Sequence, residues 1–207
     1  MGRYTGPKCR QCRREGEKLY LKGERCFSDS CPLSNKSYPP GERGSGRRRR
    51  PSQYQIHLRE KQKARRIYGV GERQFRRYVE EAKGKKGITG DVLLTSLESR
   101  LDNLVYRAGF ASSRAQARQL VAHGHFAVNG RAVNIPSFMA KEGDLVSVKE
   151  GRRDRVRDIL EANKEREIPS WFERDQEKMA FQLISSPNLE ETGHTVAANL
   201  IVEYYSR

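Results

Sequence analysis

The stretch GFASSRAQARQLVAHGHFAVNG, residues 109–130, decides the fold in the middle of this 207-residue chain. Ser113 and Gln116 have the spacing of a capping box, which predicts a short helix over residues 113–121. The Asn-Gly pair at 129–130 is a strong signal for a type I′ turn, and apolar residues alternate on either side of it. The stretch therefore predicts a helix that leads into an antiparallel hairpin.

The flanking sequence extends this unit in both directions. Upstream, apolar residues at helical spacing predict one helix that Gly109 ends. These residues are Leu94, Leu97, Leu101, Leu104, Val105 and Ala108. Downstream, residues 145–148 predict a third strand, and residues 152–167 predict a charged helix. Residues 91–149 are thus expected to form two helices followed by a small antiparallel sheet.

Positive charge is concentrated in one part of the chain. Residues 1–86 contain 25 Lys and Arg against 9 Asp and Glu, whereas residues 87–207 contain 16 against 17. A region with such an excess repels itself unless a polyanion neutralises it, which points to nucleic acid or an anionic membrane. The most basic stretch has too few bulky apolar residues for a membrane-surface helix. No apolar run of about 18 residues occurs, and no signal segment is present, so we expect a cytoplasmic protein with no membrane partner.

Two basic helices are predicted within residues 52–83. Ser52 and Gln55 have capping-box spacing, and the glycines of residues 69–71 divide the segment. The second helix has one apolar face. The preceding residues, 36–51, are rich in Pro, Gly and Arg and are expected to form a basic arm without regular structure.

Four cysteines mark an N-terminal module, residues 1–35. Two residues separate Cys9 from Cys12, four separate Cys26 from Cys31, and thirteen lie between the pairs. In a reducing compartment this spacing favours a tetrahedral metal site over disulfides. Four thiolates leave no open coordination position, so the metal would be structural and would fold a module with almost no core. Zinc is the metal expected; an iron–sulfur cluster on the same cysteines and four free thiols are the alternatives.

The basic residues of the first 86 positions are predicted to follow a phosphate backbone. Arginine dominates the arm, and its planar guanidinium binds phosphate bidentately and stacks on bases. If about ten phosphates are neutralised, log K should fall with log salt at a slope of about −7 to −9. The residues predicted to contact RNA are Arg3, Lys8, Arg10, Arg13, Arg14, Arg43, Arg47, Arg48, Arg49, Arg50, Arg59, Lys61, Lys63, Arg65, Arg66, Arg73, Arg76, Arg77, Lys83, Lys85 and Lys86. For each of them, a solvated surface cation is the alternative.

The middle segment resembles the RNA-binding module of the S-four family of small-subunit ribosomal proteins. The motifs that carry this resemblance are RLD at 100–102, RAGF at 107–110, SSRAQAR at 112–118, GHF at 124–126, VNG at 128–130 and GD at 143–144. The paired cysteines, the basic arm, the helical segment and the tail NLIVEYYS at 199–206 also resemble that family. The resemblance covers essentially the whole length, in the bacterial form that keeps its four cysteines.

The resemblance implies a role on the ribosome. Carried over residue by residue, it implies RNA contacts by Arg100, Arg114, Arg118, His123 and Arg131. It implies a structural constituent of the small subunit that binds small-subunit rRNA early, nucleates assembly of the subunit body and supports translational accuracy beside neighbouring ribosomal proteins. Some family members also bind their own mRNA. No small-molecule substrate is implied.

The expected fold class is α+β with four parts. Residues 1–35 form the four-cysteine metal knuckle, and residues 36–51 form the basic arm. The resemblance implies that residues 180–207 pack back on a basic helical domain, residues 52–90. Residues 91–179 form the inserted RNA-binding module with its charged helix.

Two other classes of protein are alternatives to an RNA-binding protein of the ribosome. The sequence RLD at 100–102 is similar to the catalytic motif of pseudouridine synthases, but in a leucine-striped helix Asp102 is expected to form a salt bridge or a cap. No P-loop, Rossmann glycine pattern or nucleophile–base set is present, so no enzyme activity is expected. A zinc-dependent DNA-binding regulator would need a recognition helix with base-reading side chains, and none stands out.

Overall fold

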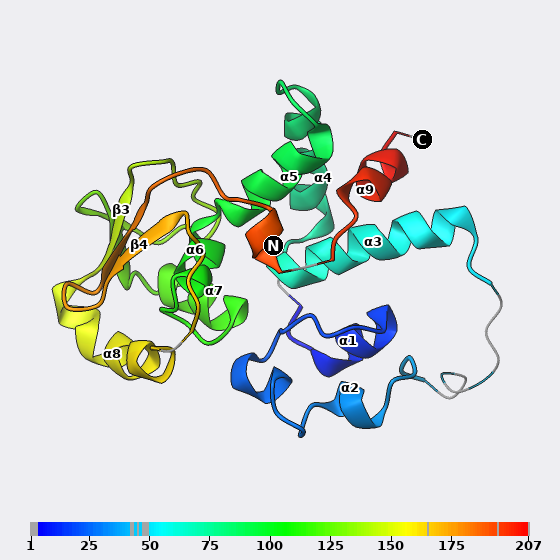
Figure 1. Cartoon of the computed structure of the whole chain (residues 1–207), viewed down its shortest axis with the longest axis horizontal. Coiled ribbons are helices and arrows are strands. Elements are labelled where there is room, and N and C mark those ends of the chain that lie inside the picture. The colour runs from blue at the N-terminus through cyan, green and yellow to red at the C-terminus, as the bar shows by residue number, and fades with distance from the viewer. Residues whose placement is uncertain are drawn as a thin grey trace. The chain divides into compact units, whose positions relative to one another are not determined.

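The chain divides into two compact units in the computed structural model (Figure 1). The structure describes residues 4–41, 44, 46, 50–164, 166–193 and 195–206. Unit 1 comprises Met1–Leu93 and Thr195–Arg207, and unit 2 comprises Leu94–His194. The mixture of helices and antiparallel strands confirms the α+β class. Within the described ranges, no helix has the length and apolarity needed to span a bilayer.

Three short helices shape the N-terminal module of unit 1. They are α1 (Cys9–Glu15), η1 (Gly23–Cys26) and α2 (Pro32–Asn35). Gly16 ends α1 in the left-handed region, with φ of 81°. Leu19 is buried here together with three of the four cysteines, Cys12, Cys26 and Cys31. So small an apolar core is consistent with a module that needs a further source of stability.

The two predicted basic helices are α3 (Gln53–Tyr68) and α4 (Glu72–Lys83). The hydroxyl of Ser52 accepts from the backbone N–H of Gln55 at 3.3 Å, and the Gln55 side chain accepts from the Ser52 N–H at 3.2 Å. This confirms the predicted capping box. The predicted apolar face of α4 is confirmed too, since its side chains are buried. They are Phe75, Tyr78, Val79 and Ala82.

The C-terminal segment returns to unit 1 as α9 (Ala198–Tyr204), which lies beside α3 (Figure 1). Ile201 is fully buried in this contact region. The first turn of α5 (Thr89–Glu98) also lies against α9: a Cβ atom added at Gly90 would stand 2.8 Å from the Cβ of Ala198. Glycine at position 90 is therefore required by the close approach of two helices.

The leucine stripe forms two helices rather than the single helix predicted from its spacing. After α5 ends, Arg100 is extended (φ −69°, ψ 136°) and α6 (Leu101–Arg107) begins. The backbone groups released at this break find partners, because the side chain of Asn103 donates to the carbonyl of Glu98 at 2.9 Å and the N–H of Leu101 donates to the carbonyl of Phe138 at 2.8 Å. The stripe stays buried across the break.

The third helix of this unit, α7 (Arg114–Ala122), begins where the sequence predicted. The hydroxyl of Ser113 accepts from the N–H of Gln116 at 3.3 Å. The Gln116 side chain instead accepts from the N–H of Ser112, at 2.7 Å. The cap is thus confirmed, but its second bond is shifted by one residue.

Unit 2 has a five-stranded antiparallel sheet, with order β2-β1-β3-β5-β4. The strands are β1 (Phe126–Val128), β2 (Arg131–Val133), β3 (Leu145–Val148), β4 (Phe172–Asp175) and β5 (Ala180–Leu183). Asn129 and Gly130 have φ of 48° and 77°, as a type I′ turn requires, so the predicted hairpin is confirmed. The last two strands were not predicted. Because β5 pairs with β3, the expectation that residues 180–207 all pack on the helical domain is wrong, and the return begins at Thr195.

One apolar cluster holds unit 2 together. It joins residues of α6, α7, α8 (Arg153–Ala162) and the sheet, and Phe110 lies 5.4 Å from Phe181 and 6.2 Å from Phe126 between ring centroids. Trp171 and Phe172 are buried. Two short helices complete the unit, η3 (Glu150–Arg152) and η4 (Glu190–Thr192).

Candidate nucleic-acid interface

Two arginines of α3 hold α1 in place. The carboxylate of Glu15 is buried; Arg66 pairs with it, and Nη1 of Arg59 lies 3.5 Å from Oε1 of the same group. Burial raises the pKa of Glu15, and the neighbouring Arg66 and Arg59 guanidinium groups oppose that rise. Both arginines stay partly exposed. Each can therefore contact a phosphate while it keeps its place in the fold.

Two lysines of α3 are inside the unit. Nζ of Lys61 is 2.8 Å from Glu72, and Nζ of Lys63 is 2.9 Å from Glu60 and 3.2 Å from Glu17. Both lysines are buried. An ammonium group that is buried and already neutralised by acids is not placed to meet a phosphate, so the RNA contacts predicted for Lys61 and Lys63 do not agree with their positions.

Glu72 fastens the C-terminal segment at the start of α4. Its Oε1 accepts from the hydroxyl of Tyr205 at 2.8 Å, and Nη1 of Arg65 is 2.6 Å from Oε2. Burial would raise the pKa of Glu72, but hydrogen bonds from Lys61 and Tyr205 and the charge of Arg65 bring that pKa below its usual value. Burial and the same carboxylate raise the pKa of Tyr205. Arg65 is thus engaged within the unit.

A second group of predicted cations is exposed but has weak partners. Nε of Arg76 is 3.0 Å from Glu80, and Nε of Arg77 is 2.7 Å from Glu81. Surface pairs at this spacing contribute only about 0.3–0.5 kcal/mol, so a phosphate can replace the carboxylate. Lys83 is exposed and donates to a carbonyl of the C-terminal segment at 3.0 Å.

The N-terminal cations are partly used to hold the chain itself. Lys8 donates to the carbonyl of Tyr4 at 2.6 Å. Arg13 donates to the carbonyl of Tyr38 at 2.9 Å and lies 4.8 Å above the centre of its ring. Five predicted contacts lie outside the described residues, and they are Arg3, Arg43, Arg47, Arg48 and Arg49.

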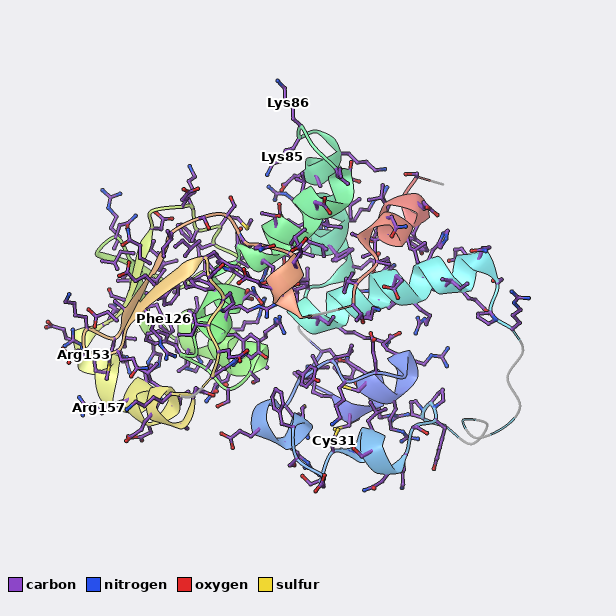
Figure 2. All side chains as sticks on the ribbon, in the orientation of Figure 1. Cys31, Lys85, Lys86, Phe126, Arg153 and Arg157 are labelled. Atoms are coloured by element: carbon purple, nitrogen blue, oxygen red, sulfur yellow. The ribbon has the colours of Figure 1, made fainter. Side chains whose placement is uncertain are left out.

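The remaining residues predicted to contact RNA are exposed, with no hydrogen bond or ion pair to another side chain that the structure describes. They are Arg10, Arg14, Arg50, Arg73, Lys85, Lys86, His123 and Arg131. Figure 2 shows Lys85 and Lys86 extending from the tip of the loop between α4 and α5. The arginines and lysines of this set form no ion pair with a described acid and carry their full charge to a ligand, so they are the strongest candidates for phosphate contact.

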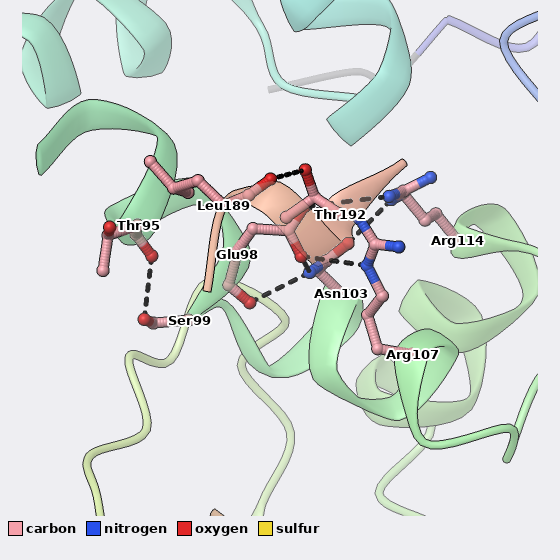
Figure 3. A network of polar contacts seen from close by, with 8 residues as sticks. All are labelled: Thr95, Glu98, Ser99, Asn103, Arg107, Arg114, Leu189 and Thr192. Atoms are coloured by element: carbon pink, nitrogen blue, oxygen red, sulfur yellow. Dashed lines mark hydrogen bonds and ion pairs between the residues drawn. The ribbon is translucent and has the colours of Figure 1, made fainter. Parts of the chain in front are cut away.

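A buried polar network lies at the start of α6 in unit 2 (Figure 3). Oε2 of Glu98 accepts from Nδ2 of Asn103 at 2.6 Å and from Nε of Arg107 at 3.0 Å. Arg114 donates to the side-chain oxygen of Asn103 at 2.7 Å, and its guanidinium lies 4.5 Å from the centre of the Tyr106 ring. Arg114 therefore packs within the unit, with little of its side chain exposed.

Arg100 and Asp102 form a second buried pair. Nε and Nη2 of Arg100 donate to the two carboxylate oxygens at 3.0 and 2.6 Å, and Nη1 of Arg118 lies 3.0 Å from Oδ2. This confirms the salt bridge expected for Asp102. Arg100 has no exposed area, so its burial disagrees with the RNA contact implied by resemblance. Arg118 is partly exposed and stays a predicted contact.

A basic cluster at the start of α8 was not predicted from the sequence. Burial, and then the charges of Arg152, Arg155 and His123, lower the pKa of His125. Arg152 and Arg155 are exposed and form no ion pair with a described side chain. Asp154 lies in the same stretch and is 3.4 Å from Nη1 of Arg157, so Arg152 and Arg155 are the cations of this cluster that favour an anion. The run RRDRVR at 152–157 was the available signal, but the near-neutral total of residues 87–207 concealed it.

None of the four cysteines forms a disulfide, and three of them are buried. The backbone N–H of Lys22 donates to Sγ of Cys26 at 3.3 Å. Cys31 is seen beside α2 in Figure 2. Among the described residues, however, no three His, Cys, Asp or Glu side chains are grouped so that they could hold a metal ion. The donor set suits a thiophilic metal, and the metal site stays a prediction.

An ordered scaffold that displays unpaired cations on both of its units is typical of a nucleic-acid-binding protein. Comparison with known proteins specifies the family. Residues 3–98 match the model of the ribosomal protein S4/S9 N-terminal domain, and residues 99–146 match that of the S4 domain. The chain is 57% identical over 208 residues to "Small ribosomal subunit protein uS4A" of Symbiobacterium thermophilum, and 55% identical over 209 residues to "Small ribosomal subunit protein uS4" of Thermus thermophilus. Both matches cover 100% of each chain.

This chain belongs to the uS4 family of small ribosomal subunit proteins. The family consists of structural RNA-binding proteins, which agrees with the expectation that the chain is not an enzyme.

Proposed function

We propose that this protein is a structural constituent of the small ribosomal subunit in the cytoplasm, where it binds small-subunit rRNA and neighbouring ribosomal proteins. The observation that carries the proposal is the exposed set of cations without acid partners, present on both units of a chain whose full-length relatives are named small ribosomal subunit protein uS4. No small-molecule substrate is required.

The division of the cations explains how one chain can be both basic and folded. Cations paired with Glu15, Glu17, Glu60 and Glu72 hold α1, α3 and α9 together without adding to the repulsion. The unpaired cations can then neutralise RNA phosphates, and the salt ions condensed on the RNA are released. On this proposal the protein binds rRNA as a preformed scaffold, which suits an early role in nucleating the subunit body. We propose two further roles for the same surface, which are support of translational accuracy and binding of the protein's own mRNA.

Competition binding tests this function. The full chain is titrated with transcribed small-subunit rRNA across a salt series, in the presence of excess bulk tRNA or duplex DNA. We expect tight binding that survives both competitors, because a shaped rRNA site adds contacts that a generic polyanion lacks. Equal loss to all competitors would reduce the protein to a general polyanion binder and contradict the proposal.

We further propose that Cys9, Cys12, Cys26 and Cys31 hold one structural zinc ion. Support comes from the all-thiol donor set, the burial of three of these cysteines and the small apolar core around them. The bound metal would supply folding free energy to the N-terminal module and no reactive position. An iron–sulfur cluster remains the rival occupant.

Metal analysis of the purified chain distinguishes these occupants. We expect one zinc per chain and no visible absorption, and we expect zinc to be lost from the double variant Cys9→Ser, Cys12→Ser. Removing the metal should unfold residues 1–35 but leave the fluorescence of Trp171, the single tryptophan of the chain, unchanged in unit 2. Iron with sulfide, or a metal-free chain that stays folded at the N-terminus, would overturn the zinc assignment.

A further inference from the structure

The segment that joins α1 to α2 and includes η1 can be followed in Figure 1. It carries two stacked, exposed aromatic rings that no part of the proposed phosphate surface uses. The rings of Tyr20 and Phe27 have centroids 4.9 Å apart and planes inclined by 29°. Phe27 is 70% exposed and Tyr20 is 37% exposed. Large apolar side chains exposed together in this way mark a contact surface, since water does not favour them.

The backbone holds this pair at a cost. Tyr20 has φ of 51°, in the left-handed region that bulky residues rarely adopt. The surrounding loop enforces it: Leu19 is buried on one side, and the N–H of Lys22 donates to Sγ of Cys26 on the other. Strain of this kind persists where the neighbouring structure fixes it, and it is concentrated at functional sites.

The charge beside the rings is positive. Residues 18–27 contain Lys18, Lys22 and Arg25 against the single acid Glu24. Lys22 and Arg25 are exposed, and neither forms an ion pair with a side chain that the structure describes. An aromatic pair with an exposed cation two residues along the chain from each ring suits a ligand that is itself planar and attached to phosphates.

We propose that the Tyr20–Phe27 pair binds an unpaired nucleobase of RNA, which stacks on the exposed face of Phe27 while its flanking phosphates meet Lys22 and Arg25. This rests on the proposed function for RNA as the partner. It adds a different mode of recognition, a single-stranded base held by stacking, to the backbone contacts described above. A two-ring platform is too small for a stable protein interface, and its cations favour RNA over an apolar peptide.

Photochemical crosslinking locates such a base in the intact chain. The probe is a single-stranded RNA of about ten nucleotides with one 4-thiouridine. After trypsin, which cleaves at Lys18, Lys22, Arg25 and Lys36, we expect the crosslinked base on segments 19–22 and 26–36. A base stacked on an aromatic ring contributes enough that removing the ring should lower the crosslink yield on these segments about 5- to 100-fold.

Matched variants separate stacking from apolar contact. Phe27→Tyr keeps the ring and should crosslink as the unaltered chain does, whereas Phe27→Leu keeps only the apolar volume and should show the full loss. Because Phe27 is exposed, neither change disturbs a core. Ile135→Ala, an exposed apolar position in unit 2, should have no effect.

Two results would overturn the inference. One is crosslinks confined to other segments, and the other is a Phe27→Leu chain that crosslinks as well as the unaltered protein, as an apolar protein-docking surface would allow. The competition assay with rRNA keeps the two proposals distinct. If rRNA binding survives competitors while crosslinks lie elsewhere, only the stacking site fails; if rRNA binding is lost to competitors, the proposed function fails as well.

Discussion

Glu98 is the residue on which the polar interior of unit 2 depends. Its carboxylate is 1% exposed and accepts from Asn103 and Arg107 at 2.6–3.0 Å. A buried carboxylate is tolerated only when cations and hydrogen bonds replace the water it has lost. The reverse also holds, because Arg107 and Arg114 would lose the negative charge of Glu98, 2.9 and 4.0 Å away, if that residue were neutral.

The variant Glu98→Gln is therefore expected to lower the free energy of unfolding of unit 2 by about 3–5 kcal/mol. Urea unfolding followed by Trp171 fluorescence measures this. The same substitution at Glu80, which pairs with Arg76 on the surface, is the control and should change stability by less than about 0.5 kcal/mol. Equal effects at the two positions would show that the network contributes nothing specific.

The lowered pKa of His125 allows us to predict how the stability of unit 2 depends on pH. Burial first, and then the charges of Arg152, Arg155 and His123, lower the pKa of His125 in the folded state. In the unfolded chain the imidazole titrates near its ordinary pKa of about 6.5. The folded state thus binds this proton less readily than the unfolded state does. The contribution of His125 to the free energy of unfolding is therefore complete above about pH 6.5 and is lost as the pH falls through the lower pKa of the folded state.

We expect the slope of unfolding free energy against pH, between about 5 and 6.5, to be shallower in His125→Gln than in the unaltered protein. The slopes are compared, because removing a buried side chain also lowers the free energy of unfolding at every pH. His123→Gln, an exposed neighbour, is the matched control and should keep most of the slope. Indistinguishable slopes for the His125 variant and the unaltered chain would rule out this residue as the source.

At the scale of single elements, the packing of α9 against α3 and α5 depends on one glycine. Gly90 leaves room for Ala198, and an added Cβ would stand 2.8 Å from another Cβ and 3.4 Å from the backbone carbon of Ala198. Neither contact atom is the end of a flexible side chain. Gly84, at the end of α4, has only the carbonyl oxygen of Glu81 nearby, at 3.7 Å.

Gly90→Ala is expected to destabilise unit 1 by about 1–3 kcal/mol, since overpacking exceeds the helix propensity that alanine gains. Gly84→Ala, the same chemical change at an open position, should leave stability unchanged or raise it. Circular dichroism during thermal unfolding, with Trp171 reporting on unit 2 separately, measures both variants. A stable Gly90→Ala chain would mean that α9 does not lie as closely as the structure places it.

Local signals predicted local elements well, and long-range pairing poorly. The caps at Ser52 and Ser113 and the turn at 129–130 were predicted correctly, because each depends on residues within one turn of the chain. Strands β4 and β5 were missed, since a four-residue strand has little periodicity of its own and is stabilised by partners such as β3, far away in sequence. The break at Arg100 was missed for the same reason: it is stabilised by a bridge to Met139.

In the candidate site, the pairing of charges could not be predicted from the sequence either. In sequence, Lys61 and Lys85 are equivalent members of one basic region, but Lys61 is buried against Glu72 while Lys85 extends into solvent. Only the fold decides which acids meet which cations. The net charge could predict that a polyanion binds, whereas the choice of contacting side chains required the structure.

At the scale of the whole molecule, some cations have acid partners and others have none among the described residues. The salt dependence of RNA binding therefore tests the contribution of individual cations. Each Lys or Arg that neutralises a phosphate contributes about 0.7–0.9 to the slope of log K against log salt. A cation already neutralised by a carboxylate contributes less, because its partner must first be displaced. Two sets of residues from neighbouring parts of unit 1 can therefore be compared directly.

The variant Arg73→Ala, Lys85→Ala, Lys86→Ala removes three exposed cations without acid partners among the described residues, and should make the slope shallower by about 2–3. The variant Arg76→Ala, Arg77→Ala removes two cations that Glu80 and Glu81 partly neutralise, and should change it by less than about 1. Filter binding of rRNA at several salt concentrations measures both slopes. If the change per residue is equal in the two variants, acid partners do not decide which cations meet RNA, and net charge alone would describe the interface.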